Sequence, residues 1–204
     1  MPRLSEKSLE LTICAQMGHY AGRLMFWFGL TQSEEARWGY DARTRIGGRL
    51  CVFQFKASNY VTRTGDRKFK APHDQMVQLR RLCGNRRGWV FYVLPLIGNT
   101  DEIVGMPDII AQSWLLDVAD IPDPVPDPLT RTGTIRASGE HYIYARPGFA
   151  RIHSEPFDVP LYSAAKILAD KQQTGLPDTE KGFWQHLTLK QEVFPKRTYG
   201  VIIT

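Results

Sequence analysis

Residues 40–57 read YDARTRIGGRLCVFQFKA, and this segment decides the fold. Two β-prone runs, 40–46 and 49–57, flank the pair Gly47-Gly48. Two glycines between such runs predict a tight hairpin, because its turn needs positive φ angles that glycine adopts without strain. We therefore expect two neighbouring antiparallel strands here.

The length of the loop sets the register of this hairpin. A two-residue loop pairs Ile46 with Arg49, which places Asp41 directly opposite Gln54. Side chains alternate between the two faces of a strand, so Lys56 shares the face of Gln54. A carboxylate, an amide and a lysine thus meet on one face, provided that no bulge shifts the pairing.

A helix is expected before the hairpin. Ser5 is a typical N-cap, and Glu6 follows it in the first turn, where a carboxylate suits the helix dipole. The helix over 6–17 carries an apolar stripe, and Glu10 lies on the same side one turn further along. Glu10 is a full turn into the helix, too far from its start to cap the helix.

A second helix and a strand are expected after the hairpin. The helix begins near Pro72 and ends before Gly84, and Gln75 lies beside its apolar stripe. The continuous apolar run 89–96 predicts a buried strand.

The remaining stretches give weaker patterns. Residues 58–71 are polar and basic with a turn at 64–66, and no first strand can be assigned between Met17 and Asp41. Beyond Gly98 the expected elements are a helix over 109–118, a hairpin of 134–137 with 141–145, a helix over 161–173 and a strand over 199–203.

These elements bring together oxygen-bearing side chains and one lysine. Oxygen ligands hold a hard divalent cation such as Mg²⁺. Such a cation polarises a phosphoryl oxygen and helps to deprotonate water. A lysine ammonium orients the attacking water or neutralises the developing charge. The set therefore favours phosphodiester hydrolysis.

The sequence Gly39-Tyr40-Asp41, followed by a short hairpin and by Gln54-Phe55-Lys56, resembles the PD-(D/E)xK nuclease superfamily. The glutamine resembles that of the Mrr-like branch. The family core runs helix, three strands, helix, strand, an order that residues 5–97 follow approximately. The resemblance implies an α/β fold with a restriction-endonuclease-like core, a mixed β-sheet flanked by helices. Residues 98–204 would form a C-terminal α+β extension packed on this core, within a single domain spanning 1–204.

The resemblance also implies roles for individual residues. Glu10, Asp41 and the Gln54 carbonyl would hold Mg²⁺ or Mn²⁺, and Lys56 would be the catalytic lysine. Tyr40 stands where the family has proline, and Gln54 is neutral where most relatives have a carboxylate. With one fewer negative charge, the site should bind its metal more weakly than a site with three carboxylates.

Three further side chains are candidates around this site. Glu35 could support the ligands or bind the metal, although a solvated Glu34–Glu35 pair is the simpler interpretation. Gln75 could contact phosphate or Lys56, or it could simply belong to a core helix. Glu6 is a substitute for Glu10 as the ligand from the first helix.

Positive charge is concentrated in one part of the chain. Residues 37–90 carry thirteen Lys and Arg against three Asp, a net charge of +10, whereas the whole chain has +5. This pattern is typical of a protein that binds a polyanion, nucleic acid above all, and a solvated basic face is the alternative. The predicted nucleic-acid-binding residues are Arg43, Arg63, Arg67, Lys68, Lys70, Arg80 and Arg81.

The resulting hypothesis is a Mg²⁺-dependent endonuclease that prefers DNA to RNA and could serve in defence against foreign DNA. One alternative is a degenerate nuclease that binds nucleic acid without cutting it, and another is a scaffolding subunit that binds a partner protein. A protein partner or a homodimer is compatible with each of these hypotheses. The three cysteines have no metal-finger spacing, and no apolar signal region or membrane span is found in the sequence. We therefore expect a reduced, cytoplasmic protein.

Overall fold

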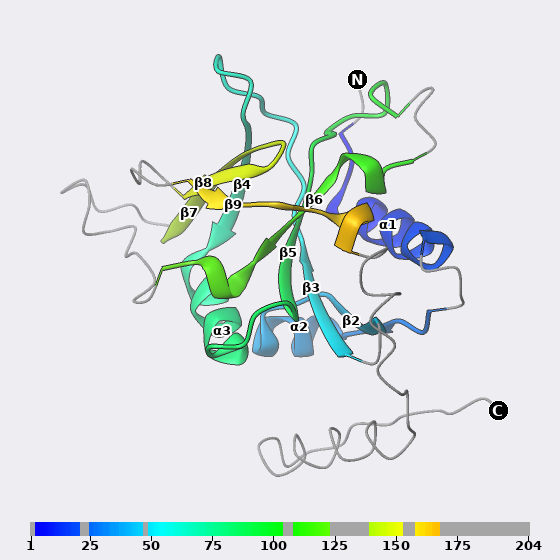
Figure 1. Cartoon of the computed structure of the whole chain (residues 1–204), viewed down its shortest axis with the longest axis vertical. Helices are drawn as coiled ribbons and strands as arrows, with labels where there is room; N and C mark the ends of the chain where they lie inside the picture. The colour runs from blue at the N-terminus through cyan, green and yellow to red at the C-terminus, as the bar shows by residue number, and fades with distance from the viewer. Residues whose placement is uncertain are drawn as a thin grey trace, which may run out of the picture.

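The computed structural model describes residues 3–20, 25–46, 49–103, 108–122, 139–152 and 158–167 (Figure 1). Its α-helices are α1 (Glu6–Tyr20), α2 (Gln32–Trp38) and α3 (His73–Cys83), and short 3₁₀ turns occur at Ile110–Gln112 and Val118–Asp120. Its strands are β1 (Phe28–Gly29), β2 (Ala42–Ile46), β3 (Arg49–Phe55), β4 (Arg67–Pro72), β5 (Val90–Pro95), β6 (Ser113–Asp117), β7 (Glu140–Arg146), β8 (Phe149–Ile152), β9 (Val159–Pro160) and β10 (Tyr162–Ser163).

A six-stranded mixed sheet forms the centre of the molecule, in the order β1-β2-β3-β5-β6-β10. Strands β3 and β5 are parallel, and the other neighbours are antiparallel. A parallel pair needs a crossover connection, which here contains β4 and α3. The predicted α/β class with a mixed sheet and helices is therefore confirmed.

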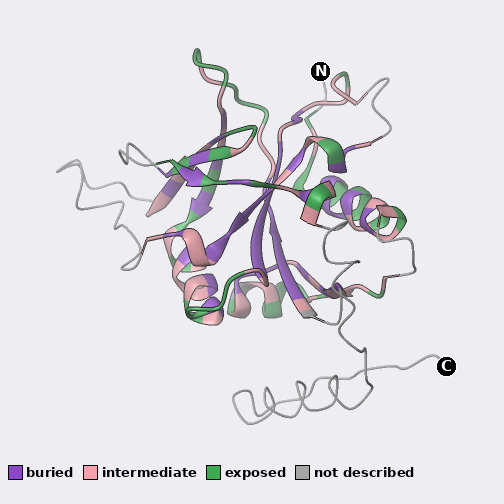
Figure 2. Ribbon diagram, viewed as in Figure 1, coloured by how far each residue is buried: buried purple, intermediate pink, exposed green. Residues whose placement is uncertain are grey.

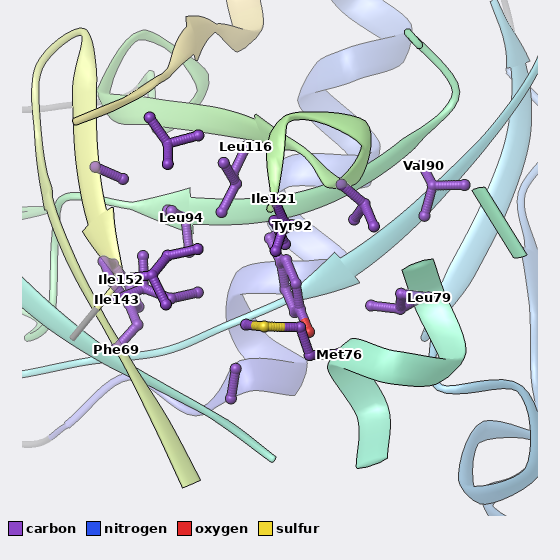
Figure 3. Close-up of a cluster of buried hydrophobic side chains, with 14 of the residues drawn as sticks. Phe69, Met76, Leu79, Val90, Tyr92, Leu94, Leu116, Ile121, Ile143 and Ile152 are labelled. Atoms are coloured by element: carbon purple, nitrogen blue, oxygen red, sulfur yellow. The ribbon is translucent and has the colours of Figure 1, made fainter. Parts of the chain in front are cut away.

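The two faces of this sheet bury different partners. On one face, the α1 stripe of Leu9, Ile13 and Met17 packs with alternate side chains of the sheet such as Phe53 and Phe91. The opposite face is covered by α3 and the second sheet. The fully buried Tyr92 is one of the side chains packed there (Figure 3). The middle strands are consequently buried on both faces (Figure 2).

The second sheet is antiparallel, in the order β4-β7-β8-β9. Its inner side chains alternate with outer ones along each strand and join the same core cluster as Tyr92. The chain after residue 98 thus supplies β6 and β10 to the central sheet and β7 to β9 to the second one.

Several expected elements are confirmed. The hairpin pairs Ile46 with Arg49 and Ala42 with Phe53, the register that a two-residue loop predicts, although residues 47–48 lie outside the described part. The first helix extends to Tyr20, three residues beyond its predicted end. The helix between Pro72 and Gly84 and the buried strand of the 89–96 run both form.

The structure adds two strands that the sequence does not predict, and one predicted helix is wrong. The basic stretch 58–71 contains β4, whose alternation is hidden because the inward-facing Arg67 is charged and buried. Residues 109–118 form a 3₁₀ turn and strand β6, because pairing with β5 outweighs the helical pattern. The first strand, which the sequence does not place, is the two-residue β1.

The weakest predictions concern the end of the chain. The predicted strand 141–145 lies in β7, whose neighbours are β4 and β8, and its predicted partner 134–137 lies outside the described residues. Strand β10 occupies Tyr162–Ser163, so the helix predicted to start at Leu161 does not start there. Residues 164–167 are helical, and the remainder of that helix and the strand 199–203 lie outside the described residues. None of the helices in the described ranges is long and apolar enough to cross a membrane.

Candidate active site

The entry of the chain into β2 is set by the end of α2. Thr31 and Glu34 form a capping box that fixes the start of this helix, and Gly39 ends it with a φ of 75°. A Cβ at Gly39 would lie 2.9 Å from Gln78 Oε1 and 3.5 Å from Gln75 Cγ of α3. Glycine therefore allows both the left-handed turn and the close approach to α3 that deliver Asp41 to the sheet.

Asp41 is held against the end of β3 by two hydrogen bonds. The backbone N–H of Phe55 donates to Asp41 Oδ2 over 2.7 Å, and the side-chain amide of Gln54 donates to the same oxygen over 2.8 Å. The predicted meeting of Asp41 and Gln54 is thus found. The orientation differs from the expected one, because the acceptor-only carboxylate faces the amide nitrogen of Gln54 and not its carbonyl oxygen.

Lys56 follows β3 directly, and its side chain is buried with 7% exposure. Its ammonium lies 3.9 Å from the carboxylate of Glu6 in α1. The same Glu6 oxygen accepts a hydrogen bond of 3.3 Å from the backbone N–H of Ala57. Glu6 therefore fixes the end of β3 and forms the ion pair with Lys56. The sequence favours Glu10 over Glu6 as the carboxylate that the first helix brings to the site.

Glu10 is also buried, but its direct partner is a neighbour in its own helix. Both of its carboxylate oxygens contact the Lys7 ammonium, at 2.8 and 3.0 Å. The hydrogen bonds that Lys7 donates to Glu10 raise the pKa of Lys7, and the charges of Glu10, Glu35 and Asp41 raise it further against the effect of burial. Glu10 hence lies in the electrostatic surroundings of both Lys7 and Asp41, whereas Glu35 acts on Lys7.

Burial changes the proton affinities of the two central groups. It raises the pKa of the Asp41 carboxyl to about 6, with further increases from Glu10 and Glu6 and opposing effects of the Phe55 N–H and Lys56. Burial also lowers the pKa of the Lys56 ammonium, while Glu6 and Asp41 counteract this shift. The groups therefore form a cluster in which each charge depends on its neighbours.

Three buried polar oxygens near this cluster have no hydrogen-bond partner among the described residues. They are Gln54 Oε1, Gln75 Oε1 and the hydroxyl of Tyr92. Tyr92 lies beside Gln54 in the parallel register of β3 and β5. The pKa of its hydroxyl is raised by burial and then by the charge of Asp41. The sequence places Tyr92 in the buried strand predicted from the apolar run 89–96, and the one sign of a further role is its polar hydroxyl within that run.

The basic residues predicted to bind nucleic acid have different environments. Arg67 is buried and binds the carbonyl of Ser58 and the carboxylate of Glu102, each at 2.8 Å, so it is a structural residue and its prediction as a nucleic-acid contact is corrected. Arg43 lies over the ring of Phe28, at 5.5 Å from its centroid. The other five predicted contacts are exposed or partly exposed: Arg63, Lys68, Lys70, Arg80 and Arg81. Of these, Lys70 forms an ion pair with Glu140, and Arg80 donates a hydrogen bond to the Gly84 carbonyl.

The oxygen donors are compatible with a magnesium ion, although the described residues contain no group of three His, Cys, Asp or Glu that could hold a metal. Mg²⁺ keeps several waters and commonly binds one or two carboxylates together with substrate phosphates. Asp41 supplies one carboxylate, and the unpartnered Gln54 Oε1 is a neutral oxygen donor next to it. The residues therefore fit a hydrated cation with few protein ligands.

Searches with this chain against protein-family models, curated proteins and solved structures found no match.

Proposed function

We propose that this protein is a metal-dependent nuclease that hydrolyses phosphodiester bonds, with DNA favoured over RNA. The observation that carries the proposal is the convergence of Asp41, Gln54 and Lys56 where β2 begins and β3 ends. A partly buried carboxylate bonded to a buried amide, with a buried lysine two residues after the amide, is the arrangement that the resemblance to PD-(D/E)xK nucleases implies.

The topology supports the same proposal. With α2 between β1 and β2 and β4 before α3 set aside, the order α1, β1, β2, β3, α3, β5 resembles the helix, three strands, helix, strand of the restriction-endonuclease-like core. The parallel pairing of β3 with β5 follows from this crossover. The N-terminal turn of α1 meets the end of β3 through Glu6, which brings acidic residues of the first helix to the site.

Each residue has a defined part in the proposed reaction. Asp41 and Gln54 Oε1 would hold Mg²⁺ or Mn²⁺, which polarises the phosphoryl oxygen and acidifies a bound water. Lys56 would donate a hydrogen bond to the attacking water or to the phosphate, and its burial strengthens its field there. Water would add its oxygen to phosphorus and lose a proton to solvent, the bond between phosphorus and the ester oxygen would break, and that oxygen would take up a proton from solvent.

A cleavage assay with matched variants tests the proposal. The protein should cut labelled DNA with Mg²⁺ or Mn²⁺, and a chelator should stop it. Lys56→Met should reduce the rate by at least about a hundredfold, the order expected for one group that stabilises transition-state charge. Lys166→Met removes the same charge from an exposed position and should cut like the parent.

The outcomes separate the alternatives. Equal rates for Lys56→Met and the parent would overturn the catalytic assignment. Salt-sensitive binding of nucleic acid without cleavage by the parent favours a degenerate binding module. Absence of both binding and cleavage favours a scaffolding subunit.

A further inference from the structure

The outer face of the second sheet is rich in aromatic and basic side chains. Strands β4, β7 and β8 each place alternate residues in the core, which leaves Lys68, Tyr142, Tyr144 and Arg151 on the opposite side. Cross-strand pairing sets Lys68 beside Tyr144 and Tyr144 beside Arg151. We call the set of Tyr60, Lys68, Tyr142, Tyr144, Phe149 and Arg151 the tyrosine face.

Lys68 lies in the middle of this face. Its ammonium is 3.8 Å from the ring centroid of Tyr142, 5.8 Å from that of Tyr144 and 5.9 Å from that of Tyr60. Arg151 approaches the Tyr144 ring from the neighbouring strand, at 5.4 Å from its centroid. Within the described part of the chain, these two cations have aromatic partners and no carboxylate partner in an ion pair.

Two aromatic groups of the face are exposed to solvent, and Tyr142 and Tyr144 are half-buried. Tyr60 is 58% exposed and Phe149 is 50% exposed. Large aromatic side chains gain free energy by burial, and a folded chain does not expose several together without a reason in binding. The cations that lie among the rings make an apolar protein surface a poor occupant, because its binding would bury unpaired charge.

We propose that the tyrosine face binds single-stranded nucleic acid. Bases stack on aromatic rings, and phosphates between them are neutralised by Lys68 and Arg151. A duplex offers this face only its phosphates, because its bases are stacked within the helix and expose no ring surface. A single strand satisfies both the rings and the cations.

The face is close to the proposed catalytic lysine along the chain. Tyr60 follows Lys56 by four positions, so their backbones are at most about 14 Å apart even if the link is fully extended. A strand that stacks on Tyr60 can therefore continue towards Lys56. The inference deepens the proposed function by naming the form of its substrate.

The test measures binding in chelator, so it does not depend on cleavage. Fluorescence anisotropy would compare labelled oligo-dT, oligo-rU and a duplex, each of about 15 nucleotides or base pairs. The parent should bind at least one single strand more tightly than the duplex. The comparison of oligo-dT with oligo-rU tells whether the single strand is DNA or RNA.

Substitutions on the face give the decisive readout. Tyr60→Ala and Tyr144→Ala should each weaken single-strand binding roughly tenfold, whereas Tyr144→Phe keeps the ring and should change it less than about twofold. Tyr162→Ala, a partly exposed tyrosine of the central sheet, is the matched control and should bind like the parent. Lys68→Met should reduce the slope of log affinity against log salt by about 0.7.

The failures of the two proposals are distinguishable. Single-strand binding that depends on the tyrosines, with no cleavage under any condition, overturns the nuclease and leaves the tyrosine face standing. Parent-like affinity of both Tyr60→Ala and Tyr144→Ala, or equal affinity for duplex and single strand, overturns the tyrosine face alone. Tyr60 lies outside the strands, so its variant stays informative if Tyr144→Ala fails to fold.

Discussion

The side chain of Gln54 donates a hydrogen bond of 2.8 Å to the carboxylate of Asp41, across the paired strands β2 and β3. The next residue along, Phe55, donates its backbone N–H to the same oxygen. The carboxylate is therefore held by backbone and side chain together. Its position depends on the hairpin register, which a shift of one residue would destroy.

Asp41→Asn should make the protein more stable at pH 8 than the parent. Burial raises the pKa of Asp41 to about 6, above the usual 3.8, so the fold favours the protonated carboxyl. The parent thus keeps this stability below the usual pKa and loses it as the pH rises through about 6. The ionised parent should be destabilised by about 2 kcal/mol at pH 8, after allowance for the partial exposure of the group.

Urea unfolding of parent and variant at pH 4 and pH 8 checks this expectation. The difference between the two proteins isolates Asp41 from other titrating groups. A variant that is equally destabilised at both pH values would show that the carboxyl is not held in a protonated form by burial.

The hairpin shows how far local sequence can determine a structure. Its register follows from loop length and side-chain alternation, both of which are local, so the sequence alone is enough to place Asp41 and Gln54 opposite each other. Strand β6 illustrates the limit. Its residues carry a helical pattern, and only the edge of β5, distant in sequence, makes them a strand.

The same limit explains the errors at the site. Glu6 and Glu10 lie on the same side of α1, and the sequence cannot tell which of them meets Lys56, because that depends on how α1 crosses the end of β3. Sequence reasoning places Arg67 at the surface because charged residues are usually exposed, whereas Glu102 and the Ser58 carbonyl compensate for its burial.

Gln54 should contribute to metal binding through its carbonyl oxygen. Gln54→Leu removes that oxygen and leaves Asp41 with one hydrogen-bond donor fewer, so Mg²⁺ affinity should fall by roughly tenfold or more. Gln54→Glu adds a charge that attracts the cation and should raise the affinity. Titration calorimetry with Mg²⁺ is the measurement, and unchanged affinity in Gln54→Leu would rule out the glutamine as a ligand.

Glu6 should support the charged form of Lys56. Glu6→Gln removes the anion at 3.9 Å, so the pKa of Lys56, already lowered by burial, should fall further. The alkaline limb of the cleavage rate should then move to lower pH. Glu10→Gln is the matched control for this limb, because Glu10 contacts Lys7. It also tests the predicted ligand role of Glu10, because a loss of Mg²⁺ affinity in Glu10→Gln would support that role.

Arg67 and Arg81 should respond differently to the loss of their charge. Arg67→Met leaves Glu102 without its buried partner and should lower the free energy of unfolding by about 3 kcal/mol. Arg81 is exposed in the last turn of α3, so Arg81→Met should change stability by no more than about 0.5 kcal/mol. If Arg81 contacts phosphate, its variant should instead weaken duplex binding at low salt. Equal stability of the two variants would contradict the structural role given to Arg67.

Tyr92→Phe should leave the protein as stable as the parent or make it more stable. The hydroxyl of Tyr92 is fully buried and has no hydrogen-bond partner among the described residues, so its removal relieves a desolvation cost of about 1 kcal/mol. The ring itself is the larger contribution, because it packs in the core beside Met76 (Figure 3). Tyr92→Leu, which removes the ring, should therefore destabilise the protein by about 2 kcal/mol or more. Thermal unfolding compares both variants with the parent, and cleavage or metal titration is measured on the same samples. A Tyr92→Phe variant that is destabilised, with weaker metal binding, would mean that the hydroxyl serves Gln54 and Asp41 through a bridging water and is part of the site.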